Sequence, residues 1–247
     1  MQPSDPLLDS RSLERIVPGE LEDTGATGVE TLKLHLDRYD FAARQCLGGR
    51  VLDMACGVGY GTRRLADQNP SIRCAHGVDI SAAAVAFARQ HYADSHVSFF
   101  CDDARKFHGE ERYDTVVSLE TIEHIPDPAS LVRHLAGLVR PGGRLIGSVP
   151  TTPSVDGNPH HITDFTENSF RQLGLAAGLH EIECFRQVQR YNPQAIAAGT
   201  EKRLSRSRGQ LVSFYAQHPG KLALRLWATL RYGFANHYIT IAWEKPV

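Results

Sequence analysis

The chain has 247 residues, of which 42% are hydrophobic, and these values predict one large domain or a domain with a modest insertion. Its 27 basic and 28 acidic residues leave a formal net charge of -1, which excludes an overall electrostatic attraction to nucleic acid or to a membrane. Five cysteines without a Cys-x-x-Cys pair, a polar amino terminus and the lack of an apolar run of about 18 residues predict a cytoplasmic protein without disulfides, signal peptide or membrane span.

The first expected element is an amphipathic helix over 30–47, in which apolar residues recur at spacings of three and four. Strand patterns follow at seven places, namely 50–55, 74–80, 97–103, 113–120, 144–152, 180–189 and 237–245. Helical stretches lie between members of the first five strands, and the last of them is expected to stop at Pro141-Gly142-Gly143. Such alternation predicts an α/β fold with a doubly wound, mostly parallel sheet. Residues 190–236 are expected to form a helical cap inserted between the sixth and seventh strands of the same domain.

A glycine-rich turn, 56–61, follows the first strand. Because open parallel sheets bind ligands at the carboxyl ends of their strands, this turn is a candidate binding site. Glycine lets the backbone approach a ligand closely, and the next helix offers free N–H groups. Two other interpretations are a plain strand-to-helix turn and a dinucleotide fingerprint, although the third spaced glycine of that fingerprint is missing.

Acidic residues follow the second and third strands. Asp79 is placed where a carboxylate accepts both hydroxyls of a ribose; it could instead cap a helix, but Ser81 is the better cap candidate. After the third strand, Asp102 and Asp103 are candidates to accept from an adenine amino group, unless they merely end the strand.

Together, VLDMACGVGYG (51–61), GVDIS (77–81), CDDA (101–104), YDTVVSLETIEHI (113–125) and LVRPGGRLIGSVP (138–150) resemble class I S-adenosylmethionine-dependent methyltransferases over residues 30–190. The resemblance implies a Rossmann-like fold whose last strand is antiparallel. It implies that Gly57 and Gly59 contact the amino-acid part of S-adenosyl-L-methionine, that Asp79 binds its ribose and that Asp103 with Ala104 binds its adenine. The remaining residues expected around the cofactor are Asp53, Ala55, Ile80 and Glu120; Ala55 stands where the family commonly has glycine.

A second group of polar residues follows the fourth and fifth strands. Glu120, Glu123 and His124 would share one face of a helical turn, and a distant histidine would complete a site for Mg²⁺, Mn²⁺ or a borderline metal. The spacing resembles the metal site of small-RNA 3′-terminal 2′-O-methyltransferases, and similar residues occur in ubiquinone-pathway O-methyltransferases. By that resemblance Glu120, Glu123, His124 and His161 are the ligands, with His161 preferred over His160, and the metal chelates two neighbouring hydroxyls. The alternative is a metal-free pocket with Glu123, His124 and His161 as catalytic residues.

Residues 14–19, 35–43 and 158–161 also resemble bacterial methyltransferases of saccharide and secondary-metabolite assembly. This resemblance implies a small hydroxylated acceptor, such as a sugar or nucleotide sugar, and residues 1–29 as an amino-terminal lid or tail before a domain of residues 30–247. Within 186–231 there are nine basic residues and one acid, Glu201, which indicates either phosphate recognition or a solvated helix face balanced by acids elsewhere. The aromatic residues there, including Trp227, have a spacing that favours packing, so RNA ranks below a small acceptor.

The sequence therefore predicts an S-adenosylmethionine-dependent O-methyltransferase. Three alternatives stay open: an N-methyltransferase of an amino sugar or amine, a metal-dependent RNA 3′-terminal 2′-O-methyltransferase, and a non-catalytic cofactor-binding regulatory protein. The expected partner is a small acceptor, with or without a phosphate group.

Overall fold

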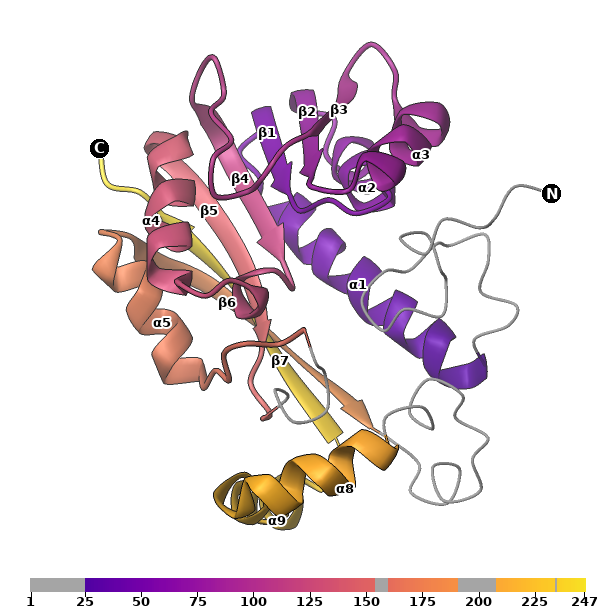
Figure 1. The fold of residues 1–247 in the computed structure, drawn as a ribbon. Coiled ribbons are helices and arrows are strands. Elements are labelled where there is room, and N and C mark those ends of the chain that lie inside the picture. Colours follow the sequence, from indigo (N-terminus) through magenta and orange to yellow (C-terminus); the bar gives the residue numbers. More distant parts are fainter. Residues whose placement is uncertain (1–24, 154–159, 191–207, 234) are drawn as a thin grey trace, which may run out of the picture.

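The computed structural model describes residues 25–153, 160–190, 208–233 and 235–247, and a single seven-stranded sheet runs through them (Figure 1). Its strands are β1 (Gly49–Met54), β2 (Ile72–Asp79), β3 (Val97–Cys101), β4 (Tyr113–Leu119), β5 (Val139–Pro150), β6 (His180–Arg190) and β7 (Ala235–Glu244). They lie in the order β3-β2-β1-β4-β5-β7-β6, and only β7 runs antiparallel to its neighbours. The predicted doubly wound, mostly parallel sheet with an antiparallel last strand is confirmed.

Helices cover both faces of this sheet. On one face lie α1 (Gly25–Gln45), α2 (Tyr60–Gln68) and α3 (Ala82–Tyr92), packed on a core that includes Leu65 and Phe99. On the other lie α4 (Pro128–Leu138) and α5 (Glu167–Ala176), packed on a core that includes Leu135, Phe170 and Trp243. Ser81 caps α3 by accepting a hydrogen bond from the N–H of Ala84, as the sequence predicted.

The Pro141-Gly142-Gly143 triplet does not stop a helix, so that expectation was wrong. Helix α4 already ends at Leu138, and the triplet belongs to β5. Val139 pairs with Tyr113 of β4 and Arg144 pairs with Thr115, so residues 140–143 bulge out of the ladder. Gly142 supplies the positive φ of 67° that such a bulge favours.

Within the expected insertion 190–236, the described part contains two helices, α8 (Arg208–Gln217) and α9 (Pro219–Tyr232). Lys221 of α9 forms an ion pair with Asp164 at 3.1 Å. Trp227 is 55% exposed, and Leu226 and Leu230 beside it are exposed as well, so the spacing that favours packing does not bury Trp227. Among the described residues, no helix combines the length and the apolar character needed to span a bilayer.

Residues 25–29, assigned to the lid or tail in the sequence analysis, form the first turns of α1. The rest of that segment, residues 1–24, lies outside the described residues.

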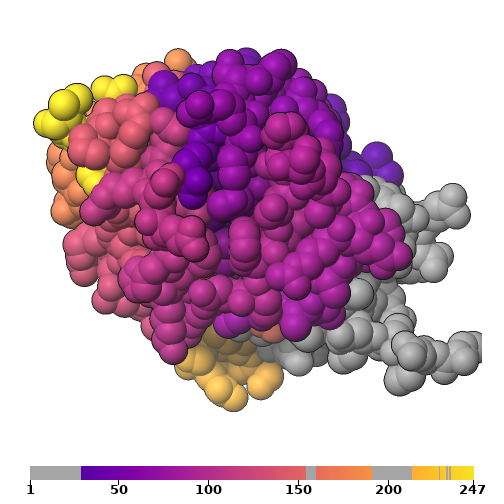
Figure 2. All heavy atoms as spheres, turned by 90° about the horizontal axis from the view of Figure 1, so that it is seen from above, coloured from indigo at the N-terminus to yellow at the C-terminus, as the bar shows by residue number. Residues whose placement is uncertain are grey.

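The parallel strands end level with one another. Asp53 of β1 pairs with Gly77 of β2 and with Val117 of β4, so the chain leaves β1 opposite the ends of β2 and β4. Chain order reverses between β1 and β4, where open α/β sheets bind their ligands. This edge points downward in Figure 1; Figure 2 looks from above onto the opposite side, where most visible atoms belong to the first half of the chain.

Candidate active site

The glycine-rich turn after β1 has three residues in the left-handed region: Ala55 (φ 64°), Gly57 (φ 58°) and Gly59 (φ 89°). The two glycines serve different purposes. A Cβ on Gly57 would meet nothing within 4 Å, so this part of the backbone faces open space. A Cβ on Gly59 would lie 2.6 Å from the Ala88 side chain and 2.8 Å from the Phe99 ring. Gly57 is therefore placed to approach a ligand, whereas Gly59 is required for packing.

Asp79 at the end of β2 turns its carboxylate towards this turn. Its Oδ2 accepts from the Gly57 N–H at 2.8 Å and its Oδ1 from the Ser81 N–H at 2.9 Å, and the residue is 6% exposed. The two bonds fix the carboxylate beside the open space at Gly57, as a ribose-binding acid requires. Next to it, Ile80 is 67% exposed, which suits an apolar contact with a bound base.

Asp103 follows β3 and is engaged with Arg105. Its Oδ1 accepts from the Arg105 backbone N–H at 2.9 Å, and the guanidinium pairs with the carboxylate. These bonds lower the pKa of Asp103 to about 2. Asp102 is exposed, and Ala104 packs against the core. An adenine amino group would share the Asp103 carboxylate with Arg105.

Asp53 lies behind the turn rather than on its open side. It is 1% exposed, and its carboxylate accepts from Thr62 Oγ1 at 2.7 Å and from the Tyr39 hydroxyl at 3.2 Å. Burial raises the pKa of Asp53 to about 7, although both hydrogen bonds lower it. Asp53 thus ties α1, β1 and α2 together beneath the turn. The sequence pattern offered no signal for Tyr39 or Thr62 in this role.

Glu120 directly follows β4 and has a positive φ of 50°, which costs a non-glycine residue conformational energy and is common at functional sites. Its Oε1 accepts from Ser148 Oγ at 2.7 Å and lies 3.2 Å from Nη1 of Arg38. Arg38 is a buried residue of α1 that also donates to Gln187 and lies over the Tyr238 ring. Arg38 could not be recognised from the sequence, because nothing in a helical repeat distinguishes a buried arginine from an exposed one.

Glu123, His124 and His161 form a compact cluster. Glu123 and His124 lie in the short 3-10 turn η3 (Ile122–His124) after β4, and each of the three residues offers one ligand atom within 4.8 Å of the others. Glu123 is fully buried, and its Oε1 lies 4.0 Å from His124 Nε2. The His124 and His161 rings meet edge to face with centroids 4.7 Å apart. Of the four predicted ligands, the structure brings these three together and turns Glu120 towards Arg38 and Ser148.

Backbone contacts hold the distant histidine in place. The N–H groups of Ile162 and Thr163 donate to the Glu123 carbonyl at 2.9 and 3.2 Å, which docks the segment after residue 159 onto η3. His124 Nδ1 lies 3.1 Å from the carbonyl oxygen of His160. Because a carbonyl only accepts, this contact assigns a proton to Nδ1, so that in the neutral imidazole the lone pair is on Nε2, on the side of Glu123. That is the form in which histidine binds a metal or accepts a proton.

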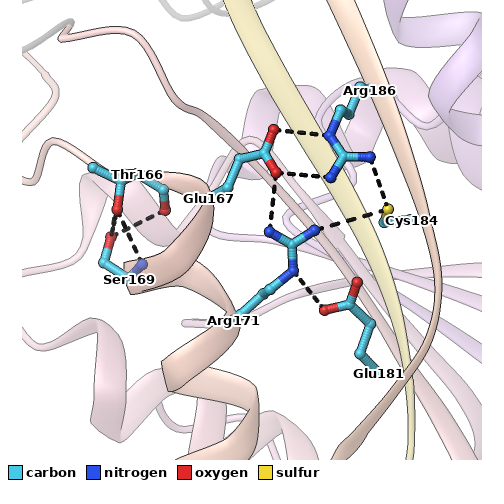
Figure 3. A network of polar contacts seen from close by, with 7 residues as sticks. All are labelled: Thr166, Glu167, Ser169, Arg171, Glu181, Cys184 and Arg186. Atoms are coloured by element: carbon cyan, nitrogen blue, oxygen red, sulfur yellow. Dashed lines mark hydrogen bonds and ion pairs between the residues drawn. The ribbon is translucent and has the colours of Figure 1, made fainter.

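Two basic residues of the 186–231 segment, Arg186 and Lys221, form ion pairs with acids. Arg186 makes two hydrogen bonds to Glu167, which also binds Arg171, and the sulfur of Cys184 lies between the two guanidinium groups (Figure 3). These arginines, with Arg186 the larger contributor, lower the pKa of Glu167 to about 2. Lys221 is paired with Asp164. Both basic residues thus have acidic partners, and Arg186 lies on strand β6 rather than on a helix, while Lys202, Arg203 and Arg206 lie outside the described residues.

Comparisons with known proteins agree with this arrangement. A family model described as a methyltransferase domain matches residues 31–235. Among curated proteins, the ubiquinone biosynthesis O-methyltransferase of Alkalilimnicola ehrlichii is 39% identical over 119 residues, which are 45% of this chain and 47% of that protein. The match therefore spans about half the length of that relative.

Solved structures share the fold at low identity. The YcgJ protein of Bacillus subtilis has a TM-score of 0.64 at 17% identity, over 85% of this chain and 99% of its own. The N-methyltransferase NodS of Bradyrhizobium japonicum, in complex with S-adenosyl-L-homocysteine, has a TM-score of 0.59 at 16% identity, over 98% of this chain and 100% of its own. With the family model covering most of the sequence and the sheet order expected of the fold, this chain belongs to the class I S-adenosylmethionine-dependent methyltransferases.

Proposed function

We propose that this protein is an O-methyltransferase that transfers the methyl group of S-adenosyl-L-methionine to a hydroxyl of a small molecule with two neighbouring hydroxyls. The observation that carries the proposal is the cluster of Glu123, His124 and His161, whose ligand atoms lie within 4.8 Å of one another. The cluster follows β4, whose end is level with the glycine-rich turn after β1. A methyl donor at Gly57 and Asp79 and an acceptor at the cluster would occupy the same edge of the sheet.

The names of the curated relatives support oxygen as the acceptor atom, because the matching proteins act in ubiquinone biosynthesis as O-methyltransferases. A hydroxyl needs help in losing its proton, whereas an amine needs little. Two imidazoles and a carboxylate at the acceptor position supply that help. This polar set also argues against a regulatory protein that only binds the cofactor.

In the proposed reaction the acceptor oxygen attacks the methyl carbon in line. The new oxygen–carbon bond forms as the sulfur–carbon bond breaks, and the sulfonium becomes the neutral thioether of S-adenosyl-L-homocysteine. His124 takes the hydroxyl proton on Nε2, because its Nδ1 is held at the His160 carbonyl. Glu123, buried within 4.0 Å of Nε2, stabilises the imidazolium that forms. Alignment of donor and acceptor supplies the rest, and no covalent enzyme intermediate is needed.

The same three residues fit a divalent cation. With one bound, Glu123, His124 and His161 would be its ligands, and the cation would lower the pKa of the hydroxyl in place of a base. Two imidazoles and one carboxylate suit Mn²⁺ or a borderline metal better than Mg²⁺, which prefers oxygen ligands. Glu120 would remain outside this ligand set, with Ser148 and Arg38.

The proposal is tested by screening catechols, polyols, nucleotide sugars and amines for a methyl mass shift, with a chelator and with added Mn²⁺. We expect a hydroxylated acceptor to be methylated, and Glu123→Gln and His161→Asn to reduce turnover by about 100-fold. His160→Asn is the matched control, since His160 is exposed and offers its backbone carbonyl to the site. Calorimetry with S-adenosyl-L-homocysteine should give unchanged affinity in all three variants. Methylation of amines alone, or full activity in Glu123→Gln, would refute the proposal.

A chelator separates the two forms of the mechanism. Loss of activity that Mn²⁺ restores supports the cation at the cluster, whereas unchanged activity assigns proton removal to the histidines alone. An RNA 3′ end methylated in preference to every small acceptor would refute the proposed substrate class.

A further inference from the structure

A second group of reactive side chains lies on β2, away from the candidate active site. Cys74 and His76 are two residues apart on this strand, so their side chains leave the same face of the sheet. Tyr113 begins β4 and reaches them across β1. Tyr113 is the first residue of β4 and Cys74 the third of β2, so the group lies away from the carboxyl ends of these strands, where the glycine-rich turn and the cluster of Glu123 lie.

Short contacts join these three side chains in a row. Cys74 Sγ lies 3.0 Å from His76 Nε2, and His76 Nδ1 lies 3.0 Å from the Tyr113 hydroxyl. Tyr113 is 1% exposed, and the His76 ring also packs edge-on against Phe100, so the imidazole is held in one orientation. A nucleophile, an imidazole and a third group that orients the imidazole is the arrangement that activates a thiol or hydroxyl.

The charges around His76 favour its neutral form. Burial and then the positive charge of Arg50 lower the pKa of His76, while Glu110 opposes this shift. Arg50 is the register partner of Cys74 on β1, and its guanidinium lies over the Tyr113 ring. A neutral imidazole is the form that accepts a proton from the thiol.

We propose that Cys74 is a modification site at which His76 activates the thiol towards soft electrophiles and low-molecular-weight disulfides. The Cys74 S–H proton passes to His76 Nε2, and the sulfur attacks one sulfur of the disulfide. The old S–S bond breaks, a mixed disulfide forms on Cys74, and the departing thiolate takes the proton from His76. The incoming disulfide is reduced as Cys74 is oxidised, so no further oxidant is needed.

The other four cysteines provide internal comparisons. Cys46 and Cys56 are buried, and burial raises the pKa of both thiols, so they should stay unreactive in the folded protein. Cys101 is more exposed than Cys74, and its sulfur contacts the Ile80 carbonyl at 3.6 Å rather than an imidazole. The sulfur of Cys184 lies 3.3 Å from an Arg186 nitrogen, again rather than beside an imidazole. Accessibility alone would therefore make Cys101 the fastest, whereas activation makes Cys74 the fastest.

The test is the rate of alkylation of each cysteine by iodoacetamide in the folded protein, followed by peptide mass spectrometry. We expect Cys74 to react about tenfold faster than Cys101, and His76→Asn to remove that advantage while the Cys101 and Cys184 rates stay unchanged. A Cys74 rate no higher than that of Cys101, or a Cys74 rate that His76→Asn leaves intact, would overturn the proposal.

Labelling of Cys46 and Cys56 reports any unfolding of a variant. If His76→Asn unfolds the protein, Tyr113→Phe decides, because it keeps the buried ring and removes only the hydroxyl that holds His76. We then expect a slower Cys74 reaction with unchanged Cys184 labelling, and an unchanged Cys74 rate would count against the proposal. Incubation with oxidised glutathione should place the mixed disulfide on Cys74 first, and a mixed disulfide that forms first on Cys101 would contradict it.

Discussion

Replacing Asp53 by asparagine should remove a pH dependence of stability that arises beneath the cofactor turn. Asp53 is 1% exposed and is held by Thr62 and Tyr39. Burial, the largest cause, raises its pKa to about 7. A carboxyl in the unfolded chain has a pKa of about 3.9, so between about pH 4 and pH 7 the folded protein keeps a proton that the unfolded chain has lost.

The sign of the effect follows from this difference in bound protons. Because the folded state binds the extra proton, the Asp53 contribution to stability is fully present below about pH 4 and is lost as the pH rises to about 7. A gap of about 3 pKa units at about 1.4 kcal/mol each sets an upper limit of about 4 kcal/mol. The amide introduced by Asp53→Asn carries no charge at any of these pH values. The free energy of unfolding of this variant should therefore not show the decrease with rising pH that Asp53 causes in the native protein.

The assay is urea denaturation of the native protein and of Asp53→Asn at several pH values across this range. Other titrating groups are common to both proteins and cancel in the difference between their free energies of unfolding. Between about pH 4 and pH 7 we expect the native protein to lose up to about 4 kcal/mol of stability relative to Asp53→Asn. Parallel profiles for the two proteins would refute the reasoning, because Asp53 would then titrate alike in the folded and unfolded states.

Three further predictions concern the residues after β1 and the acid beside them, Asp79. Ala55→Gly should raise the free energy of unfolding by up to about 1 kcal/mol in thermal denaturation, since the left-handed φ of 64° strains alanine but not glycine. The Gly57→Ala variant should fold with a small loss of stability but bind S-adenosyl-L-homocysteine more weakly in calorimetry. The Gly59→Ala variant should instead have a lower thermal midpoint, because the new Cβ would meet side chains at 2.6 and 2.8 Å. The reverse pattern for the two glycines would contradict their assignment. Asp79→Asn should weaken binding of the same ligand about tenfold or more, with little change in the acceptor cluster, and unchanged affinity would remove Asp79 from the ribose site.

The fold was predictable because its signals are local. Alternating strand and helix patterns give the parallel sheet, and Ser81 before an alanine-rich helix gives the cap that the structure shows. Pro141-Gly142-Gly143 was mistaken for a helix stop, because proline and glycine are common both after helices and in strand bulges. Which of the two forms depends on pairing with β4 and with Lys245 after β7, and the local sequence does not show this pairing.

The candidate site was predictable only in part. Spacing favoured His161 over His160, and the structure places His161 against His124. Sequence could not separate the roles of Gly57 and Gly59, because the atoms that crowd Gly59 come from α3 and β3. It could not reveal that Glu120 turns to Ser148 and Arg38, since that contact joins β4, β5 and α1 and depends on a positive φ.

The most direct test is a crystal structure grown with S-adenosyl-L-homocysteine and Mn²⁺. The account predicts the ribose hydroxyls on the Asp79 carboxylate, the amino-acid part of the ligand beside Gly57, and the sulfur directed towards Glu123, His124 and His161. Ligand density elsewhere on the sheet, or a sulfur directed away from that cluster, would contradict it.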